Sequence, residues 1–204
     1  MKPFTAVWWT VFLASLAPCA WLLIAAATGR LTANPIEFLT HETGWYALTW
    51  LMLSLAVTPI RRLTGWNNVI KLRRMLGLFS FFYASLHLGV WVGLDRFFDV
   101  PFMVEDVIER RFITAGMATW ALMLPLALTS TAGMIRRLGR RWRQLHRLAY
   151  VAAVGGVVHY WWLVKADTRE PLRFAVVLAV LLGLRVWWSV AARARATRPG
   201  PARA

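Results

Sequence analysis

Six long apolar blocks constrain the fold of this 204-residue chain more than any other feature of its sequence. A helix that crosses the hydrocarbon core of a bilayer needs about 20 mostly apolar residues, and each block reaches or approaches that length. We therefore predict an all-α integral membrane protein, a bundle of six transmembrane helices. The blocks are Val7–Thr28, Gly44–Ile60, Met75–Leu94, Ile113–Ser130, Leu145–Val164 and Leu172–Val190.

The sign of the clustered charge alternates from one connection to the next. All nine acidic residues lie in the first, third and fifth connections: Glu37, Glu42, Asp95, Asp99, Glu105, Asp106, Glu109, Asp167 and Glu170. Basic clusters occupy the second connection, the fourth and the C-terminal segment: Arg61, Arg62, Lys71, Arg73, Arg74; Arg136, Arg137, Arg140, Arg141, Arg143; Arg193, Arg195, Arg198, Arg203. Because Lys and Arg collect on cytoplasmic loops, we expect both termini inside the cell.

The formal net charge of +15 would suggest a nucleic-acid partner if the protein were soluble. An electrostatic footprint for DNA or RNA would not alternate with membrane spans, however. Nucleic-acid binding is therefore excluded, and membrane lipid is the expected surrounding.

The chain is expected to form one domain over residues 1–192, followed by a short, flexible, basic cytoplasmic tail over residues 193–204. The first apolar block is longer than that of a signal peptide, so we prefer an uncleaved helix. Within Asp95–Phe112, apolar and acidic residues recur at near-helical spacing, which predicts a short interfacial helix. Pro59 and Pro171 are expected at helix boundaries, because proline disrupts helix interiors.

Two histidines inside the blocks are predicted to lie at the same depth. His87 is 13 residues beyond Arg74, about 20 Å of helix. His159 is 16 residues beyond Arg143, about 24 Å of helix. Both blocks run outward from the cytoplasm, so both imidazoles should lie in the outer half of the membrane.

Ionisable side chains at membrane depth are candidate functional residues by default. Two imidazoles that face each other across a helix bundle can ligate a b-type haem from both sides. The alternative is that each one only hydrogen-bonds a neighbouring helix. The matched depth favours ligation, and we predict a haem held between the third and fifth helices by His87 and His159.

His146 lies at the cytoplasmic edge, level with Arg73. No second histidine lies at that depth on the third helix. Arg73 precedes His87 by 14 residues, which returns to nearly the same face of a helix. Arg73 could therefore line the same groove, as a propionate partner or an unusual axial contact. Equally, it could be one more arginine that sets the topology.

One geometric condition applies to a continuous fifth helix. His146 and His159 would be about 140° apart around its axis, so they share a face only if the helix bends. Gly155 and Gly156 lie between them, where small residues permit such a bend. The fourth histidine, His41, falls in the first outer connection and is expected to be solvated.

No other chemistry is indicated by the sequence. It contains no nucleophile–base pair, phosphate-binding glycine loop or dinucleotide fingerprint. No acidic residue lies within an apolar block, so a proton relay through the membrane is not indicated. Electron transfer through a bound cofactor needs neither feature, because the cofactor carries the chemistry.

Five stretches of the sequence resemble a known family. In their order and spacing they are similar to the MsrQ (formerly YedZ) family, haem-binding membrane subunits of the periplasmic methionine sulfoxide reductase system within the ferric-reductase-like transmembrane superfamily. The chain departs from the known patterns at two places. Where the family has Lys-Arg-Pro-Tyr, this chain has Arg110-Arg111-Phe112. Its third helix has one histidine, where other members of the superfamily have two. The stretches, covering most of Gly44–Lys165, are GWYALTWLMLSLAVTPIRR, RRMLGLFSFFYASLHLGV, IERRFITAG, LALTS and RRLGRRWRQLHRLAYVAAVGGVVHYWWLVK.

The resemblance implies a cytochrome b in the bacterial inner membrane, an electron-transfer subunit of an oxidoreductase complex rather than its catalytic subunit. Its cofactors would be one or two haems b, and FMN. The quinol pool or a cytosolic flavin reductase would donate electrons, and a periplasmic molybdopterin-dependent methionine sulfoxide reductase, which repairs oxidised proteins, would accept them. The family's axial ligands of haem iron map onto His87, His146 and His159, and an arginine near the inner haem maps onto Arg73.

On this basis we expect electrons to enter at the basic inner face, near His146 and Arg73, and to leave near His87 and His159. The nearest alternative is a self-contained or partnered ferric or haem reductase of the same superfamily. A haem-free transporter or membrane scaffold is an alternative from another class. A transporter typically shows inverted repeats and helices broken at the midplane, and no such repeat is recognisable in the sequence.

Overall fold

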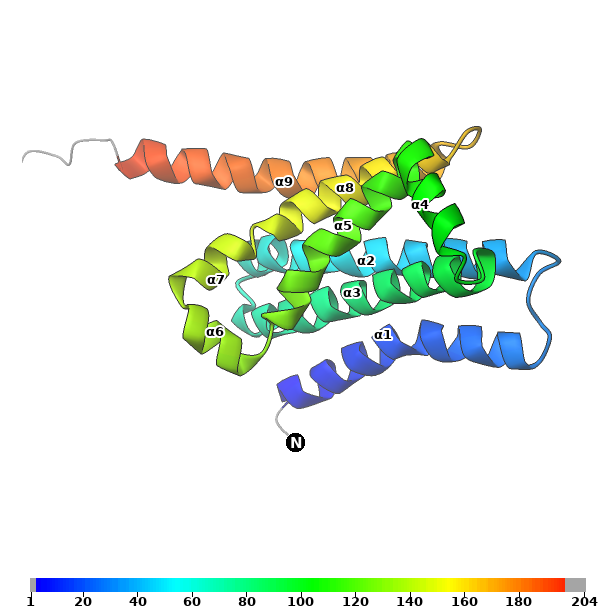
Figure 1. Cartoon of the computed structure of the whole chain (residues 1–204). Coiled ribbons are helices and arrows are strands. Elements are labelled where there is room, and N and C mark those ends of the chain that lie inside the picture. Colours follow the sequence, from blue (N-terminus) through cyan, green and yellow to red (C-terminus); the bar gives the residue numbers. More distant parts are fainter. Residues whose placement is uncertain (1–2, 197–204) are drawn as a thin grey trace, which may run out of the picture.

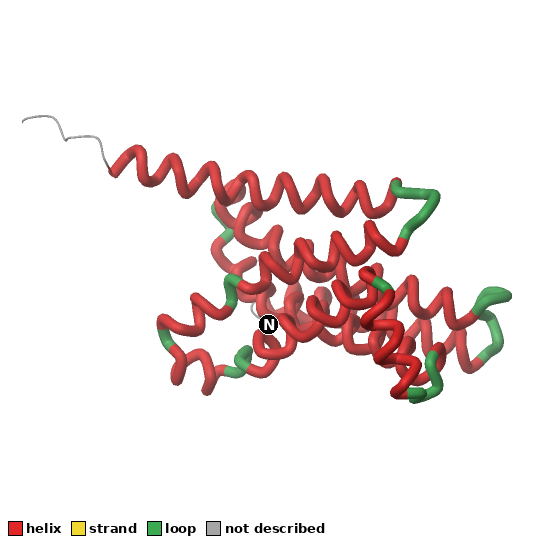
Figure 2. The backbone as a smooth tube through the Cα atoms, turned by 45° about the horizontal axis from the view of Figure 1, so that its top comes forward, coloured by secondary structure: helices red, strands yellow, loops and turns green. Residues whose placement is uncertain are grey.

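The computed structural model describes residues 3–196, and within this range it is helical, with no strand (Figures 1 and 2). Residues 197–204, most of the expected tail, lie outside the described range, and α9 continues to Ala196. The elements are α1 (Pro3–Ala27), α2 (Pro35–Thr64), the 3-10 turn η1 (Asn67–Lys71), α3 (Leu72–Val90), the π-helical turn η2 (Trp91–Asp95), α4 (Val100–Glu109), α5 (Arg111–Leu128), α6 (Ala132–Leu138), α7 (Arg140–Leu145), α8 (Leu148–Leu163) and α9 (Arg169–Ala196).

Two antiparallel helix hairpins form the centre of the bundle. α2 packs chiefly on α3, and α5 packs chiefly on α8. α9 lies against α2 and α8, while α1 lies against α3 and, more lightly, α2 (Figure 1). One apolar core, which includes Leu55 and Ala153, joins α2, α8 and α9. A second, which includes Leu76 and Phe79, joins α2 and α3 and contacts α1.

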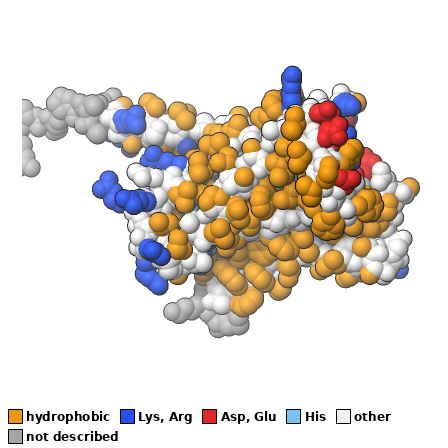
Figure 3. Space-filling view, in the orientation of Figure 1, with side chains coloured by type: hydrophobic (Ala, Val, Ile, Leu, Met, Phe, Trp, Pro, Cys, Tyr) orange, Lys and Arg blue, Asp and Glu red, His pale blue; other side chains and the backbone are white. Residues whose placement is uncertain are grey.

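The two ends of the bundle carry opposite charge. Lys and Arg side chains gather at the end formed by α6, α7 and the C-terminal part of α9, and Asp and Glu gather at the end formed by α4 and its neighbours (Figure 3). The sides between these ends are largely hydrophobic in this view. The expected helix in the third connection is confirmed as α4.

Four helical stretches of the described chain are long and apolar enough to cross a membrane: Phe4–Ala27, Asn67–Asp95, Arg111–Leu128 and Arg169–Arg195. The other two expected spans are also helical. At 16 residues α8 is shorter than these stretches, and α2 has 30 residues but carries polar and charged side chains along much of its length. A multi-pass helical membrane protein is therefore established.

α2 is longer at both ends than the sequence predicted. It begins at Pro35, where Asn34 caps the helix by accepting a hydrogen bond from the Glu37 backbone amide, and proline suits the first helical position. The prediction that His41 lies in a loop is therefore wrong, since it lies in the second turn of α2. Pro59 does not end the helix either, which continues to Thr64.

The fifth helix is not continuous over Leu145–Val164 as predicted. α7 ends at Leu145, and α8 begins at Leu148, so that His146 occupies the turn between them. α8 then continues through Gly155 and Gly156 without interruption. The break that changes the direction of His146 relative to His159 is thus at the basic end of the bundle and not at the glycine pair.

A buried tyrosine compensates for the proline inside α1. Pro18 interrupts the hydrogen-bond ladder of the helix. The Tyr83 hydroxyl of α3 accepts a hydrogen bond from the Cys19 amide (3.0 Å) and donates one to the Ser15 carbonyl (2.8 Å). It therefore bridges the Cys19 amide and the Ser15 carbonyl next to Pro18 and fastens α1 to α3.

An arginine compensates for the proline inside α2. Pro59 has no N–H to donate to the carbonyl of Leu55, four residues earlier. The Arg185 guanidinium of α9 donates to this carbonyl, and also to the Leu181 carbonyl (3.0 Å). Its Cζ lies 5.3 Å from the centroid of the Tyr150 ring. Arg185 thus holds α9 against α2 and α8.

This contact predicts a coupling between Arg185 and Pro59. Arg185→Met should destabilise the bundle by about 1–3 kcal/mol, because it leaves the Leu55 carbonyl unsatisfied in apolar surroundings. In a Pro59→Ala background, the N–H of residue 59 can donate to the Leu55 carbonyl. The loss of unfolding free energy caused by Arg185→Met should therefore be clearly smaller there. Thermal unfolding of the four proteins in detergent measures this, and equal costs in both backgrounds would contradict the assignment.

Candidate functional site

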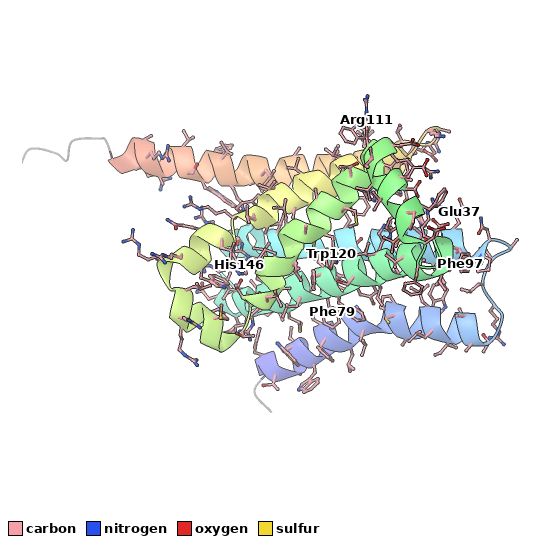
Figure 4. The ribbon with its side chains drawn as sticks, in the orientation of Figure 1. Glu37, Phe79, Phe97, Arg111, Trp120 and His146 are labelled. Atoms are coloured by element: carbon pink, nitrogen blue, oxygen red, sulfur yellow. The ribbon has the colours of Figure 1, made fainter. Side chains whose placement is uncertain are left out.

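A large cavity lies between the two hairpins. Its volume is about 1030 Å³. Apolar side chains form most of its wall. Trp120 of α5 lies about midway along the bundle (Figure 4), and its indole N–H donates a hydrogen bond to Ser85 Oγ (3.1 Å). Wall residues from α2, α3, α5 and α8 include Ala47, Leu48, Leu51, Ala84, Met117, Met123 and Gly156.

His87 of α3 and His159 of α8 both line this cavity and face each other across it. Their ring centroids are 5.9 Å apart, and the ring planes are nearly perpendicular, at 82°. The structure therefore brings together the two histidines whose equal depth the sequence predicted, although they come from positions 72 residues apart.

Each of these imidazoles is held by a backbone carbonyl of the partner helix in its own hairpin. His87 Nδ1 lies 2.8 Å from the Thr40 carbonyl oxygen of α2. His159 Nδ1 lies 2.6 Å from the Phe112 carbonyl oxygen of α5. Because a carbonyl only accepts, each Nδ1 carries the proton and donates it. In a neutral ring this leaves the lone pair on Nε2, for which the described residues offer no hydrogen-bond partner.

A glycine allows each ring to reach its carbonyl. Gly44 is four residues after Thr40, and Gly116 is four residues after Phe112, so each lies one turn along the same helix face. A Cβ placed on Gly44 would lie 3.0 Å from His87 Nδ1, and one on Gly116 would lie 2.8 Å from His159 Nδ1. Any side chain at these positions would push the imidazole away from its carbonyl.

The two hairpins therefore contribute equivalent halves of one site. Each hairpin supplies a residue with the accepting carbonyl, a glycine and a histidine. These are Thr40, Gly44 and His87 in the first hairpin, and Phe112, Gly116 and His159, each 72 positions later, in the second. Both hairpins run in the same direction through the bundle (Figure 1), so they do not form the inverted repeat of a transporter. The role of these glycines in orienting the histidines was not predicted from the sequence. The signal was the equal interval of 43 residues between glycine and histidine in each hairpin.

The residues present fit a bis-histidine haem. A bond from a metal to an imidazole nitrogen is about 2 Å long, with the ring centre roughly 1 Å further, so two rings on opposite sides of one metal have centres about 6 Å apart. The observed 5.9 Å agrees with this value. Nδ1–H bonded to a carbonyl with Nε2 free is also the usual arrangement of a metal-ligating histidine.

His146 lies elsewhere, at the basic end of the bundle (Figure 4), and does not line the cavity. Its Nε2 is 3.2 Å from the Thr129 hydroxyl. Because that hydroxyl already donates to the Pro125 carbonyl (2.7 Å), it accepts from His146, and the free lone pair of a neutral ring is on Nδ1. The ring stacks on Trp142 with centroids 3.9 Å apart.

Arg73 lies on the same side of the molecule as His146 and interacts with it electrostatically. Its backbone carbonyl accepts a hydrogen bond from Ser54 Oγ (3.0 Å). The side chain is half-buried and is not part of the cavity wall. The structure thus separates the predicted residues into two groups, His87 with His159 at the cavity and His146 with Arg73 at the basic end.

Two polar clusters contribute residues to the cavity wall near the acidic end of the bundle, and neither was recognised from the sequence. In one, the Tyr160 hydroxyl donates to Glu170 Oε2 (2.6 Å) and lies 3.2 Å from His41 Nε2. In the other, Arg96 and Arg110 both pair with Asp106. The first cluster joins three distant segments and therefore leaves no local pattern. In the second, Asp106 and Arg110 are one helical turn apart, a local signal that could have been read from the sequence.

Known proteins resemble this chain over most of its length. The model of the ferric reductase like transmembrane component family matches residues 43–157. A relative from Ralstonia nicotianae, named protein-methionine-sulfoxide reductase heme-binding subunit MsrQ, is 53% identical over 190 residues, which cover 92% of this chain and 88% of the relative. Relatives of the same name are 50% identical in Herminiimonas arsenicoxydans (88% and 84% covered) and 46% identical in Xanthomonas euvesicatoria (94% and 92% covered).

No solved structure matches the chain. The family match nevertheless covers most of both hairpins, from residue 43 to residue 157, and the matches to the relatives extend into α1 and α9. The chain therefore belongs to the ferric reductase-like transmembrane family and to its MsrQ branch.

Proposed function

We propose that the chain is the cytochrome b subunit of a methionine sulfoxide reductase system in the bacterial inner membrane. One haem b binds between α3 and α8, with His87 and His159 as axial ligands. The observation that carries this proposal is the pair of imidazoles whose Nδ1–H groups are bound to carbonyls and whose ring centres are 5.9 Å apart in a large cavity. The relatives' names, which specify a heme-binding subunit, support it.

The proposed topology has six membrane spans, formed by α1, α2, α3, α5, α8 and α9, with both termini in the cytoplasm. It is supported by the separation of basic and acidic side chains to opposite ends of the bundle (Figure 3). α2 and α8 pack between the other helices, so their polar side chains and short length are compatible with a place inside a bundle. The two histidines then lie nearer the acidic, periplasmic end.

The protein's contribution to the chemistry is placement. When bound, haem supplies the one-electron redox centre. The Thr40 and Phe112 carbonyls fix the tautomer and orientation of the two imidazoles, and also make their Nε2 atoms better donors to a metal. The apolar walls of the cavity keep water from the ring and favour a defined potential.

The proposed electron acceptor is a periplasmic molybdopterin-dependent methionine sulfoxide reductase, which would dock on the acidic end of the bundle. The donor is the quinol pool or a cytosolic flavin reductase at the basic end. FMN is proposed from the family resemblance alone. A place for its phosphate is the small basic cavity of about 210 Å³ lined by Arg140, Arg143, Gln144 and Arg147.

Replacement of either cavity histidine tests the ligand pair. His87→Ala and His159→Ala should each abolish the low-spin signal of the His87–His159 site in the reduced-minus-oxidised visible spectrum of the purified chain. His41→Ala is the matched control, because its ring nitrogens face Tyr160 and Glu42 and it should leave the spectrum unchanged. A folded wild-type chain that stays colourless when haem is supplied would refute the proposed function.

Alanine at the two glycines tests how the ligands are positioned. Gly116→Ala and Gly44→Ala should displace the adjacent imidazole and weaken haem binding by about tenfold, equivalent to an overpacking cost of roughly 1–3 kcal/mol. Gly89→Ala on α3 is the control, since nothing lies within 4 Å of its added Cβ. Haem per chain after purification measures the effect. If all three variants retained haem equally, the glycines would have no positioning role.

His146 is proposed as the ligand of a second, inner haem with Arg73 nearby. His146→Ala should then lower the haem content from two per chain to one and leave the signal of the His87–His159 site in place, because the two groups are separate. Haem quantified per polypeptide decides this. A wild-type chain with a single haem that survives His146→Ala would show that His146 is not a ligand.

A further inference from the structure

Arg96 and Arg110 share one buried carboxylate at the outer mouth of the cavity. Asp106 of α4 is only 3% exposed. Its Oδ2 lies 2.6 Å from Arg96 Nε, and its Oδ1 lies 2.9 Å from Arg110 Nε. Removal of a carboxylate from water is costly unless it is paired, so both arginines are needed to hold Asp106 and are themselves held by it.

The backbone that carries Arg96 is unusual. The chain leaves α3 through the π-helical turn η2, and the Arg96 amide donates to the Trp91 carbonyl, five residues earlier (2.9 Å). Phe97 and Phe98 follow with φ angles of 49° and 61°, a backbone region that residues other than glycine rarely adopt. This turn directs Arg96 back to Asp106, where its Cζ also lies 4.8 Å from the centre of the Phe102 ring.

Arg96 and Arg110 both line the cavity while they hold Asp106. Their contacts with that carboxylate are through Nε, and Asp95, 40% exposed, is a further 3.5 Å neighbour of Arg96 Nε. A guanidinium offers five donors in a fixed fork, so each arginine has four donors besides the Nε–H that contacts Asp106. The Arg96 side chain is 14% exposed and that of Arg110 is 46% exposed, so both remain accessible to a ligand in the cavity.

The position of these forks relative to the histidines is also specific. Arg96 is nine residues beyond His87, and Arg110 is two residues before Phe112, whose carbonyl holds His159. Each arginine is therefore just outward of one histidine. The other charged side chains that line the cavity are carboxylates, which would repel an anion: Glu37, Asp95, Asp167 and Glu170. An anionic group in the cavity would therefore be directed to the arginines.

We infer that Arg96 and Arg110, positioned by Asp106, form a clamp for the carboxylate groups of the haem, its propionates. This inference rests on the proposed function, since it requires the haem to occupy the cavity with its carboxylate edge toward the periplasmic end. Guanidinium and carboxylate form charge-assisted, often bidentate hydrogen bonds. The clamp would fix the rotation of the ring about the axis through the two histidines, which the axial bonds leave free.

A chemical comparison isolates this contact. The full chain, produced in haem-deficient cells and purified in detergent, is titrated with haem b and with haem b dimethyl ester, which lacks free carboxylates. The wild-type chain should bind haem roughly tenfold more tightly than the ester, and Arg110→Gln should reduce this ratio to about one. Arg111→Gln is the matched control, because this neighbouring arginine is exposed, is absent from the cavity wall and points away from the bundle (Figure 4).

The outcomes separate the inference from the function on which it rests. A wild-type chain that binds neither compound contradicts the proposed function. A wild-type chain that binds both equally, or an Arg110→Gln chain that keeps the wild-type ratio, overturns the clamp and leaves the function standing. Should Arg110→Gln not fold, Arg96→Lys and Arg110→Lys keep the charges beside Asp106 but lose the fork. Each should lower the ratio, and unchanged ratios in both would also overturn the clamp.

Discussion

The hydrogen bond from an imidazole Nδ1 to a backbone carbonyl is the contact on which the site depends. A carbonyl inside a helix already accepts the N–H four residues later, but it has a second lone pair. A ring from another helix reaches that lone pair only where the residue one turn on has no side chain. Thr40 with Gly44, and Phe112 with Gly116, meet this condition. The orientation of each ligand is therefore specified by a carbonyl and a glycine on the neighbouring helix.

The division of the site between two equivalent hairpins has a consequence for assembly. Each hairpin orients one histidine within itself, because both the carbonyl and the glycine belong to its own first helix. The cavity arises only when the α2–α3 hairpin and the α5–α8 hairpin pack together. A metal that requires both rings therefore favours the assembled bundle over its separate halves, as ligand binding to a native state generally does. α1 and α9 lie outside this pair and are fastened to it by Tyr83 and Arg185.

The sequence predicted the features that depend on local pattern. The length of the apolar blocks predicted the helices. The number of residues between each histidine and the preceding arginine cluster predicted that His87 and His159 lie at one depth. Features that depend on contacts between distant segments were not predicted. Gly44 and Gly116 could not be distinguished from helix-packing glycines, and the contact of Arg96 with Asp106 depends on the turn that brings the end of α3 back to α4. The wrong prediction that His41 lies in a loop has a local cause. The first turns of α2, from Pro35, contain polar residues, so the apolar pattern of the sequence did not indicate a helix there.

One chemical form recurs among the polar contacts between the helices of this bundle, a side-chain donor and a backbone carbonyl acceptor. Ser80 donates to Ala47, Ser54 to Arg73, and Trp142 to Thr129, as His87 and His159 do at the cavity. In a bilayer, apolar side chains gain little by leaving lipid for protein, so such bonds and close packing carry more of the specificity. Proline adds to the supply of acceptors, since Pro59 frees the Leu55 carbonyl for Arg185. The hydrogen bonds that orient His87 and His159 are thus of the same type as those that hold the helices together. At these two positions the bond also leaves Nε2 of the imidazole free.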